Sequence, residues 1–175
     1  MTNSRLASAL LGTATVLSLI PVLSAQTPVA PAAPIPSQII AAKKAFISNA
    51  GGLLDLNMVS GDTRRDYNQF YAAMHAWGRY DLVAAPANAD LVIQISIVYL
   101  PRQIGGDVTP FPAFRVALLD PKTNIVLWVL DEYLVDRPGI GLVLKKNRDK
   151  VFDQAIDRLV GDLKMLVAPP GDFAN

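Results

Sequence analysis

The chain contains no cysteine among its 175 residues and has a single histidine, His75. Without cysteine there are no disulfides, no thiolate metal sites, no cysteine nucleophile and no lipid-modified cysteine at a cleavage site. A single histidine excludes a site built from several histidines. His75 also lies beside an apolar helical stripe, where a structural or partly exposed histidine is the usual case. The sequence therefore predicts no metal site, no cofactor and no catalytic residue.

The chain also lacks an excess of charge of either sign, with 16 Lys and Arg against 15 Asp and Glu. Removing Met1–Ala25 takes away Arg5 and no acidic residue, so 15 basic and 15 acidic residues remain. Nucleic-acid binders carry a basic excess that neutralises phosphates, and membrane-surface binders carry clustered Lys and Arg. We therefore expect no nucleic-acid partner.

Residues 1–25 have the pattern of a secretory signal peptide. Arg5 precedes an apolar run, Leu6–Ile20, and the small residues Leu23-Ser24-Ala25 close the segment. We expect cleavage after Ala25 and a periplasmic or secreted location. The alternative is a retained anchor, but serine, threonine and glycine dilute the run, and spanning needs about 20 consistently apolar residues. No stable membrane span is expected after cleavage.

Residues 26–37 are rich in proline, which builds neither a helix nor a sheet ladder, so this segment is predicted to be an extended tether. A single α+β domain is predicted over 38–168, since 51% of the chain is apolar and can bury one core. Pro169-Pro170 ends that domain, and 169–175 are predicted to be a disordered tail.

Hydrophobic periodicity and turn residues predict the elements of the domain. Strands are expected at 42–48, 91–100, 113–119 and 125–133, and helices over about 60–78 and 147–168, whereas 101–112 and 134–146 are expected to be loops. A short strand at 80–83 stays open. The order strand, helix, strand, strand, strand, helix predicts a two-layer α+β sandwich, in which a four-stranded mixed sheet carries two helices on one face.

The two last strands flank Asp120-Pro121-Lys122-Thr123-Asn124, which is typical of a type I hairpin turn. Pairing Asp120 with Ile125 predicts a register in which one apolar face of the hairpin is left without helices. Four side chains would anchor a partner there: Trp128, Arg115, Leu119 and Leu130. Exposed apolar surface with tryptophan and arginine is typical of a partner site. The alternative, that a loop or the tether covers this face, is equally open.

The phrase Ala89-Asp90-Leu91-Val92-Ile93 followed by the hairpin Leu118–Trp128 resembles small uncharacterised envelope domains of bacteria, over Lys43–Val167. This resemblance implies a periplasmic or surface location and no known catalytic residue. The leading hypothesis is a non-enzymatic exported domain that binds an envelope protein, or itself, through the helix-free sheet face. The alternative is a small-ligand domain that uses the 101–112 and 134–146 loops, and a hydrolase comes third.

Carboxylate pairs and an arginine pair are the remaining candidates for chemistry. Asp153 and Asp157 are expected on a solvated helix face, and Asp131 and Glu132, adjacent in a strand, should point to opposite faces. Arg64-Arg65 begins a helix, where it could bind an anionic group or remain solvated. No pair of carboxylates is expected to converge across a cleft, as a glycosidase requires.

Overall fold

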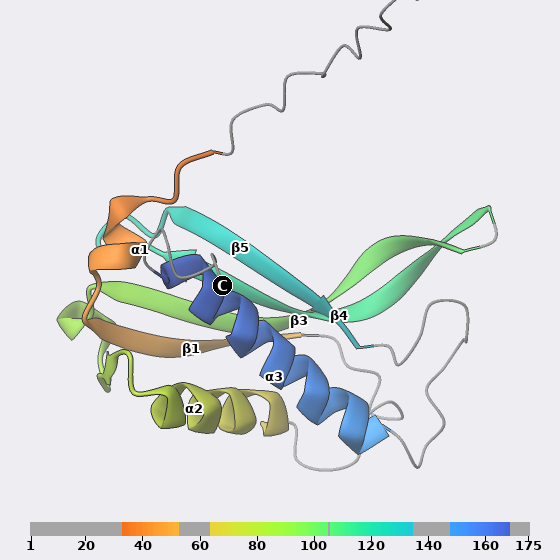
Figure 1. Ribbon diagram of the computed structural model, residues 1–175, viewed down its shortest axis with the longest axis horizontal. Coiled ribbons are helices and arrows are strands. Elements are labelled where there is room, and N and C mark those ends of the chain that lie inside the picture. Colours follow the sequence, from red (N-terminus) through yellow and green to blue (C-terminus); the bar gives the residue numbers. More distant parts are fainter. Residues whose placement is uncertain (1–32, 53–63, 105, 135–147, 169–175) are drawn as a thin grey trace, which may run out of the picture. The chain divides into compact units, whose positions relative to one another are not determined.

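Residues 33–52, 64–104, 106–134 and 148–168 are described in the computed structural model (Figure 1). Residues 34–175 form one compact unit. The predicted signal peptide, most of the predicted tether, and the predicted tail lie outside the described residues. No described helix is long and apolar enough to cross a membrane.

The described elements, in chain order, are α1 (Ser37–Ala41), β1 (Lys44–Gly52), α2 (Arg65–Trp77), β2 (Asp81–Leu82), the 3₁₀ helix η1 (Pro86–Asn88), β3 (Leu91–Ile104), β4 (Asp107–Leu119), β5 (Val126–Tyr133) and α3 (Arg148–Val167). The strands form one mixed sheet in the order β2-β1-β3-β4-β5. β1 runs parallel to β2 and β3, and β3, β4 and β5 are antiparallel neighbours. The predicted α+β class and mixed sheet are confirmed.

The predicted number of four strands is wrong, because β2 is a fifth strand. After α2 the chain returns beside β1, where Asp81 N–H donates to Lys43 O at 2.8 Å and Val83 N–H donates to Ala45 O at 3.0 Å. The five-residue helix α1 was not predicted, and it contributes the fully buried Ile39 to the core. Both elements are too short to carry a periodic pattern of their own.

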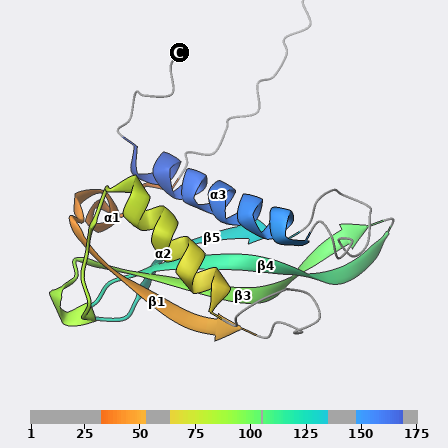
Figure 2. The ribbon, with the colours of Figure 1, turned by 90° about the horizontal axis from the view of Figure 1, so that it is seen from below.

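Helices α2 and α3 lie on the same face of the sheet, as Figure 2 shows, so the predicted two-layer arrangement is confirmed. Between the layers, Phe70 and Met74 of α2 and Leu159 and Leu163 of α3 are fully buried. The rings of Phe114 in β4 and Phe152 in α3 meet edge to face, with centroids 4.8 Å apart. The core therefore lies wholly on one side of the central strands.

Helix α2 ends where the sequence predicts, at Gly78, whose φ of 67° is the left-handed conformation that glycine adopts without strain. The sequence offers Ser60 or Asp62 as the N-terminal cap of this helix, and both residues lie outside the described residues. The spacing of Tyr67, Phe70, Tyr71, Met74 and Trp77 predicts a single apolar stripe on this helix. Tyr71 is nevertheless 38% exposed, because the buried stripe is narrower and is centred on Phe70 and Met74.

Asp90 connects the beginnings of two central strands. Its carboxylate accepts hydrogen bonds from the backbone N–H groups of Lys43 at 3.0 Å and Lys44 at 2.9 Å. These bonds lower the pKa of Asp90, with Lys44 contributing most. The role of Asp90 is thus structural, because it satisfies donors where the chain enters β1.

The segment 101–112 was predicted to be a loop, and this prediction is wrong. β3 and β4 stay paired from Val92 opposite Leu119 out to Ile104 opposite Asp107, and this two-stranded ribbon extends away from the rest of the sheet (Figure 1). The prolines of this ribbon are compatible with pairing because their backbone groups point away from the partner strand. Pro112 O accepts a hydrogen bond from Leu134 N–H at 2.9 Å, so the backbone of Pro112 faces away from β3. At such positions proline removes no hydrogen bond between the two strands.

Candidate functional site

The turn between β4 and β5 lies where the sequence predicts it. Asp120 N–H donates to Ile125 O at 3.0 Å, and Asn124 has a φ of 56°, the left-handed conformation expected for it. The Asp120 carboxylate accepts hydrogen bonds from Lys122 N–H at 3.0 Å and the Thr123 hydroxyl at 2.8 Å. These bonds, that from Lys122 first, lower the pKa of Asp120.

The predicted register fails one step beyond this turn. Leu119 pairs with Val126, but Leu118 pairs with Trp128, so β5 has one extra residue, Leu127, in a β-bulge. One inserted residue moves every following side chain of a strand to the other face. The placement of Trp128 and Leu130 on the helix-free face is therefore wrong.

Both side chains lie on the helix-covered side instead. Leu130 pairs with Val116, which is fully buried, and both Trp128 and Leu130 pack against the hydrophobic core. Further along β5, Glu132 shares this side and forms an ion pair at 2.5 Å with Arg158 of α3. The hydrophobic side chains that were expected to be open to a partner thus help to hold α3 on the sheet.

Arg115 and Leu119 do lie on the other side of the sheet, as predicted. We call this side the helix-free face, because no described helix packs on it, and define it by the side chains that alternate with the buried ones: Gln94, Ser96, Arg115, Ala117, Leu119, Val129 and Asp131. Most of these side chains are half-buried by their neighbours, and Val129 is 41% exposed. The face is thus more polar than the sequence predicted.

A bidentate ion pair lies on the helix-free face. Arg115 and Asp131 are cross-strand neighbours, and the guanidinium donates from Nε to Oδ1 at 2.7 Å and from Nη2 to Oδ2 at 2.8 Å. These hydrogen bonds raise the pKa of Arg115. The sequence analysis selected Arg115, in a register that places it diagonal to Trp128, close enough for the guanidinium to stack on the ring. The bulge removes Trp128 and Leu130 from the face, so that Asp131 lies opposite Arg115, where the predicted register has Leu130.

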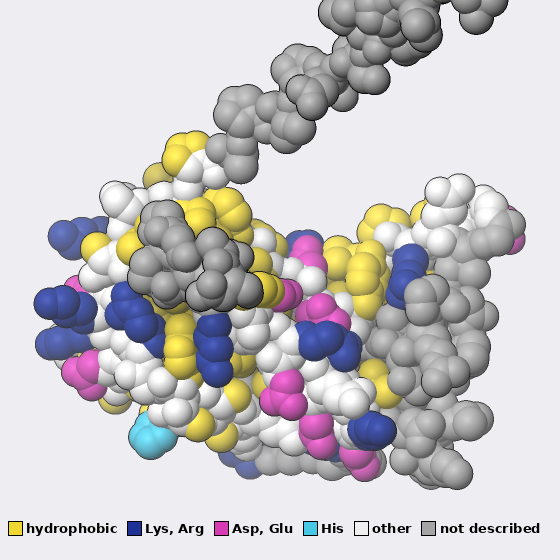
Figure 3. All heavy atoms as spheres, viewed as in Figure 1, with side chains coloured by type: hydrophobic (Ala, Val, Ile, Leu, Met, Phe, Trp, Pro, Cys, Tyr) yellow, Lys and Arg dark blue, Asp and Glu magenta, His cyan; other side chains and the backbone are white. Residues whose placement is uncertain are grey.

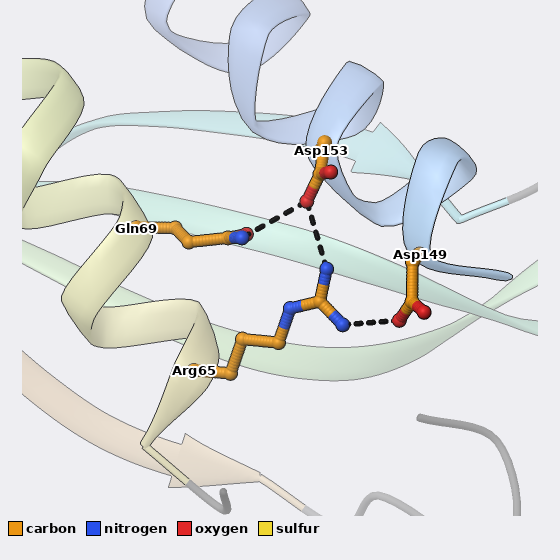
Figure 4. A network of polar contacts seen from close by, with 4 residues as sticks. All are labelled: Arg65, Gln69, Asp149 and Asp153. Carbon is orange, nitrogen blue, oxygen red and sulfur yellow. Dashed lines mark hydrogen bonds and ion pairs between the residues drawn. The ribbon is translucent and has the colours of Figure 1, made fainter. Parts of the chain in front are cut away.

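A second polar cluster joins the two large helices (Figure 4). Arg65 of α2 forms ion pairs with Asp149 and Asp153 of α3, and Gln69 donates to Asp153 at 2.9 Å. The guanidinium also lies 4.8 Å from the ring centroid of Phe152. Arg65 is thus held by these carboxylates and is not a site for an external anion, whereas Asp153, at 53% exposure of its side chain, lies on the solvated face as predicted. The cluster has a structural role, because it fixes α2 against α3.

The remaining candidates for chemistry do not converge. His75 is exposed on α2, and Asp131 and Glu132 point to opposite faces of β5, as predicted. Asp66 of α2 is only 5% exposed, and burial raises its pKa. Within the described residues, no group of three His, Cys, Asp or Glu side chains is placed to hold a metal ion.

The helix-covered side and the helix-free face differ in how charged side chains are distributed over them. Figure 3 shows that side with Lys and Arg side chains and Asp and Glu side chains spread over it, with hydrophobic atoms between them. The helix-free face, by contrast, has one arginine and one aspartate among the residues that define it, and they neutralise each other.

No family model matches the chain, and no curated protein matches it in sequence. Solved structures that resemble it include the PelC dodecamer from Paraburkholderia phytofirmans, at 17% identity and a TM-score of 0.43, covering 67% of this chain and 84% of that one. A putative neuraminyllactose-binding hemagglutinin homolog from Helicobacter pylori has 8% identity and a TM-score of 0.45, covering 72% and 86%. Uncharacterized lipoprotein B from Nitrosomonas europaea has 15% identity and a TM-score of 0.42, covering 74% and 84%.

Proposed function

We propose that this chain is a non-enzymatic binding domain of the bacterial envelope, which docks a protein partner on the helix-free face. The observation that carries the proposal is the bidentate pair of Arg115 and Asp131, which are the only charged side chains among the residues that define this face. Burying a charge is costly unless it is paired and hydrogen-bonded, and here both charges are paired within the domain. A partner can therefore cover this face without leaving either charge unsatisfied.

The composition of the face indicates the chemistry of the partner. Leu119, Ala117 and Val129 provide apolar surface around the ion pair, and Gln94 and Ser96 provide neutral hydrogen-bonding groups. A surface of this kind matches a flat, largely apolar protein surface without net charge, since an unpaired charge on the partner would find no counter-charge. The proposed anchors are Arg115, Leu119 and Val129, and Val129 replaces Trp128 and Leu130.

The geometry favours this function over the two alternatives. A ligand groove between loops at 101–112 and 134–146 would need a loop where the structure has the β3–β4 ribbon, and residues 135–147 lie outside the described residues. A hydrolase that uses two carboxylates would need them to converge. Asp131 and Glu132 instead bind Arg115 and Arg158 on opposite faces of the sheet.

Site-specific cross-linking in the host cells tests the proposal, and the absence of cysteine makes single-cysteine labelling clean. A photo-cross-linker attached at Gln94→Cys, in the middle of the helix-free face, should give one discrete adduct. The matched control is Asp157→Cys, exposed on α3 in the opposite layer, which should give none. Adding Ala117→Arg to the Gln94→Cys chain should abolish the adduct, because it places an unpaired charge in the interface.

The thermal stability of each variant must be measured alongside, so that loss of the adduct is not loss of the fold. Equal cross-linking from Gln94→Cys and Asp157→Cys, or an adduct that survives Ala117→Arg in a folded chain, would refute docking on the helix-free face.

A further inference from the structure

The free edges of the sheet differ in how they are protected against pairing with another strand. An unpaired strand edge is a template for another strand, and proteins usually protect it with short strands, prolines, charges or a covering element. Within the described residues the unpaired edges are those of β2 and of the part of β1 that extends beyond it, the two edges of the β3–β4 ribbon, and the outer edge of β5. All but the last carry a recognisable protection.

The β2 edge is short, since β2 is two residues long. Beyond it, the Tyr67 hydroxyl of α2 donates to Ile47 O in β1 at 3.4 Å. The ribbon edges carry prolines at the positions that face outward. Pro112 faces away from β3, and backbone direction alternates along a strand, so Pro110 and its cross-strand partner Pro101 face outward as well. Proline has no N–H, so each of these positions lacks the donor that an added strand would need.

Among the residues that the structure describes, the outer edge of β5 lacks this kind of protection. Leu134 N–H points toward β4, so by the same alternation Val129, Asp131 and Tyr133 turn their N–H and C=O groups outward. None of the three is a proline. The bulge lies at Leu127, near the turn, and the ladder is regular from Trp128 to Tyr133.

The charges on β5 do not protect the edge either. Edge carboxylates discourage pairing when they remain free to repel a neighbouring chain. Here Asp131 is held by Arg115 on one face of the sheet, and Glu132 is held by Arg158 on the other. The edge strand therefore presents a neutral surface, and none of the strands in the described part of the chain pairs with its outward backbone donors and acceptors.

We propose that β5 pairs in antiparallel fashion with β5 of a second copy of this chain. The two copies are related by a two-fold axis that is perpendicular to the sheet and passes through Leu130, and their five-stranded sheets join into one. In an antiparallel pair of β5 strands, the outward-facing residues of one copy must lie opposite outward-facing residues of the other. These residues alternate along β5, so this match requires that the two-fold axis passes through a residue and not between two residues. An axis at Asp131 would place two carboxylates directly opposite each other, which is unfavourable. An axis at Leu130 instead places Asp131 opposite Val129 of the second copy, and Leu130 opposite its own equivalent.

This pairing goes beyond the proposed function and does not depend on it. A two-fold axis perpendicular to the sheet leaves both helix-free faces on the same side of the joined sheet. The dimer would therefore present two docking faces next to each other, and a partner with repeated or extended surface would bind both with increased avidity.

Proline substitution at the edge tests the pairing. In Val129→Pro the missing N–H points away from β4, so the ladder within the chain is kept while two symmetric donors of the dimer are lost. Sedimentation velocity over a concentration series should show a dimer for the wild-type chain. Val129→Pro should weaken its association roughly tenfold or more. Val108→Pro is the matched control, because Val108 also faces outward but lies on the ribbon, where it is 69% exposed; it should leave the dimer unchanged.

A disulfide test reports the register directly and does not depend on the folding of a proline variant. Residues opposite each other in a non-hydrogen-bonded pair have Cα atoms about 4.5 Å apart, within the range that a disulfide spans. Under mild oxidation Leu130→Cys should form a disulfide-linked dimer, and Val108→Cys should form none. A wild-type chain that stays monomeric at every concentration, a dimer insensitive to Val129→Pro in a folded chain, or equal disulfide formation at 130 and 108 would each overturn the proposal.

These outcomes are separable from the test of the helix-free face. Gln94 lies two strands away from the β5 edge, so a heterologous adduct at Gln94→Cys in a chain that stays monomeric would support the docking function and refute the self-pairing.

Discussion

Leu118 of β4 and Trp128 of β5 lie directly opposite each other, with their side chains on the helix-covered side of the sheet. Leu118 is fully buried, and Trp128 packs against the same core while remaining half-exposed. The indole therefore covers the β5 end of the core, and its removal exposes apolar surface that it now shields.

Replacing Trp128 with serine should lower the free energy of unfolding by about 2–3 kcal/mol, somewhat less than the loss for a fully buried aromatic residue. The neighbouring substitution Val129→Ser, on the helix-free face, should change stability within about 0.5 kcal/mol. Chemical denaturation at low protein concentration measures both. Equal losses for the two variants would contradict the observed register of β5.

Leu159 of α3 is fully buried, whereas Asp157 is exposed on the same helix. Leu159→Ala should cost about 2–5 kcal/mol, because it loses the transfer free energy of the removed methyl groups and leaves a cavity. Asp157→Ala should stay within about 0.5 kcal/mol. If denaturation midpoints shift by similar amounts in the two variants, α3 does not present Leu159 to the sheet.

Asp66 should make the stability depend on pH in a direction opposite to that of most carboxylates. Burial raises its pKa in the folded chain, and hydrogen bonds from the backbone N–H groups of Tyr67 and of Asp66 itself only partly offset this. The fold thus favours the protonated form, and the contribution of Asp66 to stability grows as the pH falls through its raised pKa. At neutral pH the buried, ionised carboxylate of Asp66 destabilises the fold.

Asp66→Asn should therefore make the chain more stable than wild type at pH 7, and this gain should shrink toward pH 4. The pKa values of Asp90 and Asp120 are lowered, so the stability that these two residues contribute disappears as the pH falls. This contribution is the same in both chains, so it cancels when their stabilities are compared at each pH. A difference between the two chains that does not vary with pH would show that Asp66 is not destabilised by burial.

The sequence predicted correctly those features of the structure that depend only on residues close together in the chain. The turn at Asp120–Asn124 and the end of α2 at Gly78 were predicted because the side chain of Asp120 and the backbone freedom of glycine act within a few residues. The layer arrangement followed from periodicity in the same way. The β3–β4 ribbon was missed, because a proline is compatible with a strand only if it faces an unpaired edge, and that depends on where β5 ends.

At the candidate site, too, local sequence patterns predicted some side-chain positions and missed others. Arg115 and Leu119 were placed correctly because their strand, β4, is regular along the helix-free face. Trp128 and Leu130 were placed wrongly because a single extra residue, Leu127, reverses the faces of β5. No local pattern announces this bulge, since both registers put apolar side chains on each face of β5.

The sequence by itself determined the α+β class, the order of the main elements, the hairpin turn and the absence of thiol chemistry, because these depend on periodicity, backbone conformation and composition. Only the tertiary structure decided which face of β5 is covered and which charges are paired. Packing selects the register that places Trp128, a large aromatic side chain, against the core, and that choice pairs Asp131 with Arg115 on the helix-free face. Both are contacts between segments distant in the chain, and no short stretch of sequence encodes them.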